Sequence, residues 1–379
     1  MPDLLDIVGQ DAALAQLQRA TGGDRRPHAW LFAGPEGVGR RTTAVELARL
    51  LLCERAASRP NLGRLRDLPK DFPLRQGCGA CASCTALSAG THPDLHLVRK
   101  ELARYHDDPE VRGRKMQALG IEVIRQFLID PAGRAAAAGR GKVFVVIEAG
   151  AMSPPAQNAL LKTLEEPPAG VTLILICTRP GDLLPTTRSR CQVVRFGPLP
   201  ADFVAGALAA DGTDAGEARF WARLTEGSLG RSRRLAETDL YAFKRELLDA
   251  LAALPGGGAG ELAEKLLDAA KKQAKTLTAA DGLLAESVAT RRGGELLLGL
   301  VASAYRDALR LAAGAEGPLI HDDQRPAVEA LAGRFAPTEL ADILRQLSRC
   351  EQLIWRNVNA KLLWDNVAIT CASGVPLEV

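Results

Sequence analysis

The sequence has few aromatic residues, little net charge and no long apolar run, and each shortage excludes a class of protein. Aromatic residues make up 4% of the 379 residues and the formal net charge is only +3, which disfavours a free-standing protein that binds nucleic acid through basic and aromatic side chains. No apolar stretch reaches membrane-spanning length. The first residues lack a basic region followed by an apolar core, so we expect no secretory signal and no membrane partner.

The overall composition fits a globular protein with several domains. Hydrophobic residues account for 47% of the chain and charged residues for 25%, as in soluble globular proteins. A chain of this length predicts roughly two to three domains. The motifs that follow therefore have to be placed within more than one folded unit.

A glycine loop follows a short apolar run near the N-terminus. The run 31–33 leads into Gly34, Gly37 and Gly39, and a helix is predicted over 43–52. This order of strand, glycine loop and helix is typical of a phosphate-binding loop. In such a loop the backbone N–H groups surround a phosphate at the N-terminus of the helix.

The loop lacks the side chains that an ATPase of this kind needs. Arg40 stands where the pattern has Lys, and Arg41 stands where it has Ser or Thr. Arg40 can still pair with a phosphate, but a cation such as Arg41 cannot ligate Mg²⁺, and Thr42 comes one residue late. The strand that should end near the phosphates closes with Ile147 and Glu148 instead of the Asp that holds Mg²⁺. Glu148 is either a group that orients a water molecule or a solvated acid at the end of a strand.

The cysteines indicate a metal site. Cys78, Cys81 and Cys84 form a C-x₂-C-x₂-C pattern, and Cys53 lies at the end of the helix after the glycine loop. Four thiolates suit a closed tetrahedral zinc site, and two-residue gaps let neighbouring thiolates converge on one ion. The excursion 54–77 between the first two ligands is polar and contains prolines, which predicts a mobile segment.

Two alternatives to this zinc site stay open. His92 and His96 are rival fourth ligands. The four thiols can also be reduced and free of metal. Disulfides are disfavoured because the chain shows no export signal.

The strongest signature lies between residues 153 and 191. A helix is predicted over 156–166 and is stopped by two prolines, and the apolar run 171–177 predicts a strand buried on both faces, as in a parallel sheet. The triplet Ser189-Arg190-Cys191 then precedes another strand, 192–196. Taken alone, Arg190 would be interpreted as a surface or salt-bridged arginine.

The rest of the chain predicts helices. A boundary is expected at 197–200, short helices follow over 201–237, and the chain is entirely helical from 240 onward. Residues 226–231 (Glu-Gly-Ser-Leu-Gly-Arg) resemble the second sensor region of the lid in the AAA+ family, with Gly230 at the place of its arginine and Arg231 one step late. This is a further departure from an active ATPase.

Residues 158–168 (Asn-Ala-Leu-Leu-Lys-Thr-Leu-Glu-Glu-Pro-Pro), followed by the triplet at 189–191, resemble the clamp-loader branch of the AAA+ family. The cysteine pattern, with Gly-Thr-His-Pro-Asp at 90–94 after it, resembles the bacterial members. Among these, the degraded glycine loop is similar to that of the delta-prime subunits of DNA polymerase III. The resemblance is specific over about residues 1–200 and looser beyond.

The resemblance implies an α/β fold in three parts. These are an AAA+ P-loop domain with a parallel sheet over 1–198, which carries a zinc module at 53–96; a small helical lid domain over 199–239; and an all-α collar domain for oligomerisation over 240–379. It also implies a cytoplasmic bacterial protein.

The resemblance further implies a place in a ring with gamma/tau and delta subunits, on primed DNA, with a weak contact to the sliding clamp. Arg190, flanked by Ser189 and Cys191, is then an arginine finger that completes the ATP site of a neighbouring gamma/tau subunit. Such a finger is worth roughly 10³ to 10⁵ in rate. The chain itself is expected to have neither ATPase nor polymerase activity, and nucleotide binding without turnover stays open.

Two other interpretations remain at this point. One is an active clamp-loader ATPase of the gamma/tau kind, with Arg40 replacing Lys and Thr42 as a shifted metal ligand. The other is a free-standing zinc-bearing DNA-binding protein.

Overall fold

The computed structural model describes residues 3–23, 26–113, 118–254, 257–280, 282, 284–356 and 358–374. Within it the chain forms two compact units. The first comprises Met1–Pro200 together with Gly227–Arg231, and the second comprises Ala201–Glu226 together with Ser232–Val379. The segment Gly227–Arg231 belongs to the first unit because it packs on the glycine loop.

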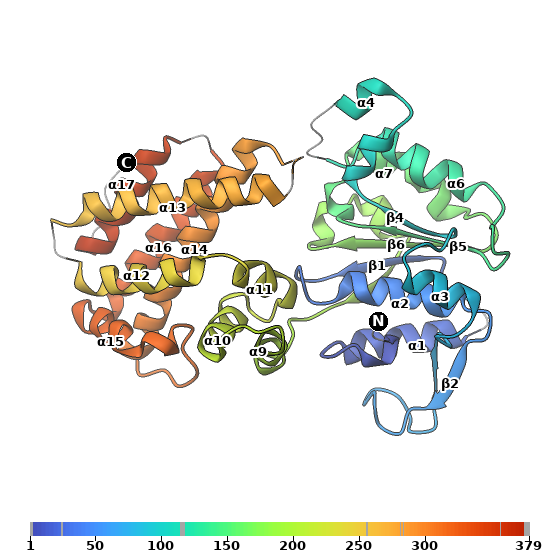
Figure 1. Cartoon of the computed structure of the whole chain (residues 1–379), viewed down its shortest axis with the longest axis horizontal. Helices are drawn as coiled ribbons and strands as arrows, with labels where there is room; N and C mark the ends of the chain where they lie inside the picture. The colour runs from blue at the N-terminus through green and yellow to red at the C-terminus, as the bar shows by residue number, and fades with distance from the viewer. Residues whose placement is uncertain are drawn as a thin grey trace. The chain divides into compact units, whose positions relative to one another are not determined.

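A five-stranded parallel sheet is the centre of the first unit (Figure 1). Its order is β4-β5-β6-β1-β7, and every neighbouring pair is parallel. The strands are β1 (Ala29–Ala33), β4 (Leu95–Val98), β5 (Lys142–Val146), β6 (Val171–Cys177) and β7 (Gln192–Arg195). β1 and β5 are buried along their whole length, as expected of strands covered on both faces. The predicted α/β class with a parallel sheet is confirmed.

Helices cover both faces of this sheet. In Figure 1, α6 and α7 lie on one side, and α1, α2 and α3 lie on the other. The α-helices of the first unit are α1 (Asp11–Gly22), α2 (Arg40–Leu52), α3 (Ala82–Ser88), α4 (Pro109–Gly113), α5 (Ile121–Ile124), α6 (Asp130–Ala132), α7 (Pro154–Glu165) and α8 (Pro185–Arg188). Shorter turns of helix are η1 (Leu4–Asp6), η2 (Lys100–Tyr105), η3 (Arg125–Ile129), η4 (Ala149–Ala151) and η5 (Pro180–Asp182). Leu160 and Leu164 of α7 pack in one apolar cluster with the strands, which fixes α7 to the sheet.

The excursion that the sequence predicts to be mobile contains two paired strands. β2 (Ala57–Pro60) and β3 (Pro73–Gln76) are antiparallel. Between them the buried side chain of Asn61 donates hydrogen bonds to the carbonyls of Leu65 and Leu68, at 2.8 and 2.9 Å. Leu65 and Leu68 of this loop, together with Leu74 of β3, pack with the N-terminal turn and α1 in a cluster that includes Leu4, Leu5 and Leu14.

The second unit is helical in its described ranges, as predicted for the C-terminal part. Its helices are α9 (Ala201–Ala210), α10 (Ala215–Leu224), the later part of α11 (Leu229–Ala236), α12 (Leu240–Ala253), α13 (Ala259–Ala280), α14 (Glu286–Ala312), η6 (Asp322–Gln324), α15 (Arg325–Arg334), α16 (Pro337–Ile354) and α17 (Ala360–Ser373). The long helix α14 packs against α13, α15 and α16. None of the helices in the described ranges combines the length and apolarity needed to cross a membrane.

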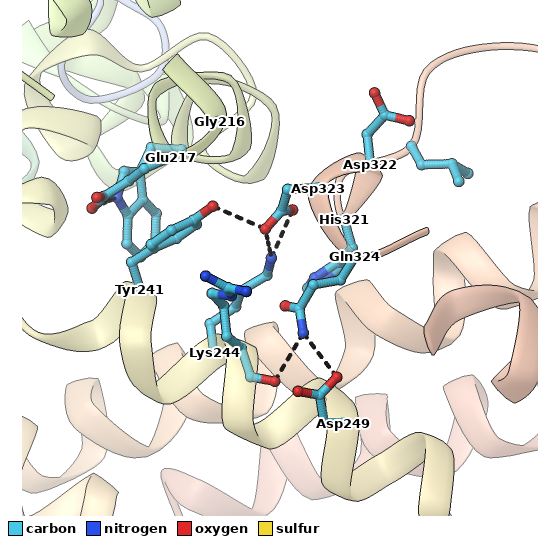
Figure 2. A network of polar contacts seen from close by, with 12 residues as sticks. Gly216, Glu217, Tyr241, Lys244, Asp249, His321, Asp322, Asp323 and Gln324 are labelled. Atoms are coloured by element: carbon cyan, nitrogen blue, oxygen red, sulfur yellow. Dashed lines mark hydrogen bonds and ion pairs between the residues drawn. The ribbon is translucent and has the colours of Figure 1, made fainter. Parts of the chain in front are cut away.

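A buried ion pair joins the first helices of the second unit to the later ones (Figure 2). Lys244 of α12 is 1% exposed, and its Nζ lies 2.7 and 2.6 Å from the two carboxylate oxygens of Asp323 in η6. The Tyr241 hydroxyl donates to the same carboxylate at 2.9 Å. The ammonium also lies 4.4 Å from the ring centre of Phe220 in α10. Helices expected in the lid and helices expected in the collar therefore share one polar network.

Candidate functional site

Three glycines shape the loop between β1 and α2. Gly34, Gly37 and Gly39 all have positive φ angles, of 152°, 74° and 98°, and Gly39 is the residue that precedes α2. A Cβ at Gly34 would lie 2.3 Å from the carbonyl oxygen of Phe196, and one at Gly37 would lie 2.4 Å from Oγ of Ser228. Glycine is therefore required at these two places by close approach as well as by backbone angle.

The chain's own residues close over this loop. The segment 227–231 lies against it, and Gly230 comes so near that an added Cβ would be 2.9 Å from Cα of Gly37. A side chain at position 230 would therefore collide with the loop. Three successive loop carbonyls, of Glu36, Gly37 and Val38, accept hydrogen bonds from Ser228 Oγ (2.6 Å), Gly230 N–H (3.0 Å) and Gln10 Nε2 (3.2 Å).

Arg40 faces the interior of the protein. It is 7% exposed, and its Nη1 donates a hydrogen bond to the carbonyl of Cys177 at the end of β6. Burial lowers the pKa of the Arg40 guanidinium from its ordinary value. The next two residues, Arg41 and Thr42, are exposed. The guanidinium at the lysine position is thus already bonded within the fold.

The residues after β5 offer little to a metal ion. Ile147 has no ligand atom in its side chain, and its N–H donates to Val98 at 2.8 Å. Glu148 is exposed and has φ 57° and ψ 47°, the left-handed region, where it begins the turn η4. No hydroxyl or second carboxylate accompanies it at positions 147 to 151.

The triplet forms a tight turn before β7, in which two residues hold the turn and the third faces outward. Ser189 Oγ donates to the carbonyl of Thr186 at 3.1 Å. Cys191 is buried, its Sγ donates to the carbonyl of Thr187 at 3.4 Å, and burial raises its pKa to about 12. The Arg190 side chain is 33% exposed and forms an ion pair with Glu165 at the end of α7. Ser189 is exposed and Arg190 is partly exposed, so a second molecule can reach both, and Arg190 is the charged residue of the two.

A groove of about 580 Å³ lies beside the triplet. It carries two exposed arginines and no acidic side chain among its lining residues, Pro180, Pro185, Arg188, Ser189, Cys191, Val193 and Arg195. Val193 and Arg195 lie two residues apart in β7 and so share one face of that strand. This side of the sheet edge is accordingly cationic.

Arg190 and the glycine loop lie at opposite ends of the strands of the sheet. The loop follows the carboxyl end of β1, whereas Arg190 precedes the amino end of β7, and these two strands are parallel neighbours. The four residues of β7 span about 13 Å. Because a finger must touch the transferred phosphate, Arg190 cannot serve a nucleotide held in this chain's own loop.

The four cysteines meet as the sequence predicts. The Sγ atoms of Cys53, Cys78, Cys81 and Cys84 all lie within 4.8 Å of one another, and those of Cys53 and Cys81 are 3.9 Å apart. A tetrahedral zinc ion with Zn–S bonds of about 2.3 Å places its sulfur ligands about 3.8 Å apart. The donor set and its spacing therefore fit a structural zinc ion.

Backbone N–H groups point at this thiol cluster. The N–H groups of Cys78, Cys81 and Cys84 donate to sulfur atoms at 3.2 to 3.4 Å. Hydrogen bonds from the N–H groups of Ala80 and Cys81 lower the pKa of the Cys78 thiol to about 6, whereas burial raises that of Cys84 to about 12. A cation at the centre would favour the thiolate form of all four.

The rival histidines lie outside this cluster. His92 Nδ1 accepts a hydrogen bond from the Asp94 N–H at 3.1 Å, and the ring of His96 stacks on Phe144 with centres 4.5 Å apart. Neither is among the four residues that converge.

Three residues of the site make contacts that the sequence does not predict. Ser228 and Gln10 bond the glycine loop, and Glu165 holds Arg190, from positions 25 to 192 residues away from their partners. Glu165 and Ser228 do lie in stretches that stand out in the sequence, at 165–168 and 226–231, but neither stretch indicates these bonds.

Comparison with known proteins identifies a replication family. The family model described as "DNA polymerase III, delta subunit" matches residues 9–200, and the model described as "DNA polymerase III, delta subunit, C terminal" matches 262–371. The delta' subunit of Bacillus subtilis (strain 168) is 24% identical over 355 residues, which cover 93% of this chain and 92% of that protein.

Two further relatives differ in how much they cover. The delta' subunit of Escherichia coli (strain K12) is 31% identical over 235 residues, 62% of each chain. The gamma/tau subunit of Mycobacterium tuberculosis (strain ATCC 25618 / H37Rv) is 32% identical over 195 residues, 52% of this chain and 28% of that protein. Because the first model spans 192 of the 379 residues and the delta' subunit of Bacillus subtilis aligns over nearly its full length, the chain belongs to the delta-prime family of bacterial DNA polymerase III subunits.

Proposed function

We propose that this chain is a non-hydrolysing subunit of the bacterial clamp loader that supplies Arg190 in trans to the ATP site of a neighbouring gamma/tau subunit. The observation that carries the proposal is the position of Arg190. Its side chain is accessible at the amino ends of the strands, whereas the chain's own glycine loop lies at their carboxyl ends. A guanidinium with free N–H groups stabilises the charge that develops on a transferring phosphoryl group.

The chain's own glycine loop does not hydrolyse ATP. Arg41 and Ile147 occupy the positions of two Mg²⁺ ligands, and without the metal the charge on the phosphates is not neutralised during transfer. Arg40 is bonded to the carbonyl of Cys177. The loop acts as a structural element that joins β1, α2 and the segment 227–231.

The partners follow from this role. They are the gamma/tau and delta subunits of the ring and primed DNA within the assembled complex, with a weak contact to the sliding clamp, in the bacterial cytoplasm. One structural Zn²⁺ would be held by Cys53, Cys78, Cys81 and Cys84. It would cross-link the module and take no part in catalysis.

The decisive test replaces Arg190 in a reconstituted clamp loader. Arg190→Ala should leave assembly intact by gel filtration and lower DNA-stimulated ATP turnover and clamp loading, with a larger effect on kcat than on KM for ATP. The loss in the whole assembly will be smaller than ~10³, because the other ATP sites use fingers from other subunits. Arg190→Lys should rescue little, since it keeps the charge and loses the planar fork. Arg134→Ala, at an exposed arginine beyond α6, is the control for loss of charge.

Two outcomes would count against the proposal. Unchanged turnover and loading in a verified Arg190→Ala complex would make Arg190 a structural residue. Phosphate release by the isolated chain with Mg²⁺, abolished by Glu148→Gln and unaffected by Arg190→Ala, would instead support an active ATPase with a variant loop. That alternative draws on the identity with gamma/tau subunits over half of the chain.

A further inference from the structure

The guanidinium of Arg190 is held on two sides by its own chain. Its Nε donates to Oε1 of Glu165 at 2.7 Å, and its Nη2 donates to the same oxygen. On the other side, Nη1 donates to the carbonyl of Thr186 at 2.8 Å. All three nitrogens are therefore engaged, and the direction of the planar group is fixed.

The two partners of Arg190 belong to elements that are themselves fixed. Glu165 is the last residue of α7, which is capped at its start by Ser153 and stopped by two prolines. Thr186 lies in α8. The buried side chain of Gln157 joins these helices, because its Oε1 accepts from the Leu184 N–H at 2.8 Å and its Nε2 donates to the Met152 carbonyl at 3.1 Å. The frame that carries Glu165 and Thr186 is thus one connected piece.

This arrangement leaves the useful donors of Arg190 available. A guanidinium has five N–H groups, and the contacts with Glu165 and Thr186 use three of them. The two that remain sit one on each terminal nitrogen. Arginine can bridge two oxygens of a phosphate with one N–H group from each terminal nitrogen.

We infer that Glu165 is a positioning residue for Arg190, which sets the finger in place before a neighbouring nucleotide arrives. The inference rests on the proposed function. Holding the long arginine side chain in one rotamer beforehand removes part of the entropy that would otherwise be lost when the finger engages. The pair is exposed, at 33% and 48% of the two side chains, so its contribution is small.

The test is a double-mutant cycle in the reconstituted complex, at saturating ATP and with primed DNA. Glu165→Ala should lower the clamp-loading rate by about 2- to 5-fold, the size expected of an exposed ion pair, and leave KM for ATP unchanged. Glu165→Gln keeps an acceptor oxygen and should lose less than Glu165→Ala. Glu166→Ala, at the exposed neighbouring acid, should load clamps at the wild-type rate.

The Arg190→Ala background separates positioning from a general structural role. If Glu165 acts only through Arg190, adding Glu165→Ala to Arg190→Ala produces no further loss. A further loss there, or a wild-type or faster rate for Glu165→Ala alone, overturns the inference while the finger role stands. If Arg190→Ala itself has no effect, the proposed function has failed, and the two failures are distinguishable.

Discussion

Arg40 and Arg190 make opposite uses of the same side chain in one domain. Arg40 is 7% exposed and donates a hydrogen bond to the carbonyl of Cys177, at the carboxyl end of β6. Arg190 lies at the amino end of β7. Its side chain is 33% exposed and is paired with the exposed carboxylate of Glu165. The first arginine is committed to the fold and the second is available to another molecule.

Under the proposed function, the difference means that the glycine loop serves the fold of this chain while Arg190 serves the ATP site of a neighbour. The strand, glycine loop and helix remain because they pack the sheet, and their glycines are required by contacts with Phe196 and Ser228. If this interpretation holds, substitutions at buried polar positions should change stability, whereas substitutions at Arg190 should change only activity in the complex.

The largest effect on stability is expected at the thiol cluster, which is committed to the fold even more completely than Arg40. One Zn²⁺ per chain should stabilise the module by about 10 kcal/mol, as in small zinc modules. Chelation should make the segment 53–96 sensitive to protease while the sheet stays folded, because the sheet has its own apolar core. Elemental analysis of metal-replete protein checks the stoichiometry. Absence of zinc, or full zinc content in a Cys81→Ser/Cys84→Ser variant, would refute the site.

Loss of the Arg40 side chain should have a smaller but clear effect. Arg40→Ala removes the donor to the Cys177 carbonyl and should cost about 1–3 kcal/mol in the free energy of unfolding, measured by chemical denaturation. Arg41→Ala, at the exposed neighbouring arginine, is the matched control and should stay within about 0.5 kcal/mol of wild type. Equal effects at the two positions would mean that Arg40 is not committed to the fold.

In the second unit, the buried His321 should make the stability of the protein depend on pH. His321 is 2% exposed, its ring lies 2.8 Å from Ser303 Oγ, and burial, reinforced by Lys244, lowers its pKa to about 3. Its ordinary pKa is about 6.5, so the unfolded chain binds the proton more readily and acid favours unfolding. Stability that is present above pH 6.5 should fall by about 1–2 kcal/mol on going to pH 5. His321→Gln should flatten that decline in a denaturation series, and an unchanged slope would contradict the assignment.

The sequence predicted the elements of the site better than their connections. The glycine loop, the thiol cluster and the turn around Arg190 are local patterns of spacing, so they can be seen in the sequence. The hydrogen bonds of Ser228 and Gln10 to the loop, and of Glu165 to Arg190, join residues far apart along the chain, and depend on how helices pack on the sheet. The strands β2 and β3 were missed because their residues are polar and include prolines at an exposed hairpin.

The smallest effect on stability is expected from substitution of Arg190. This measurement is the most direct test of the contrast between Arg190 and Arg40. Its ion pair with Glu165 is exposed on both sides, and such pairs contribute about 0–1 kcal/mol because water screens the charges and both side chains lose freedom. Ser189 and Cys191 hold the turn through bonds to Thr186 and Thr187 that do not involve the arginine. Arg190→Ala should therefore unfold within about 0.5 kcal/mol of wild type, with unchanged zinc content. Denaturation of Arg190→Ala beside Arg40→Ala makes the measurement, and a loss above about 2 kcal/mol for Arg190→Ala would place both arginines in the fold and remove the reason to assign one of them to a neighbour's active site.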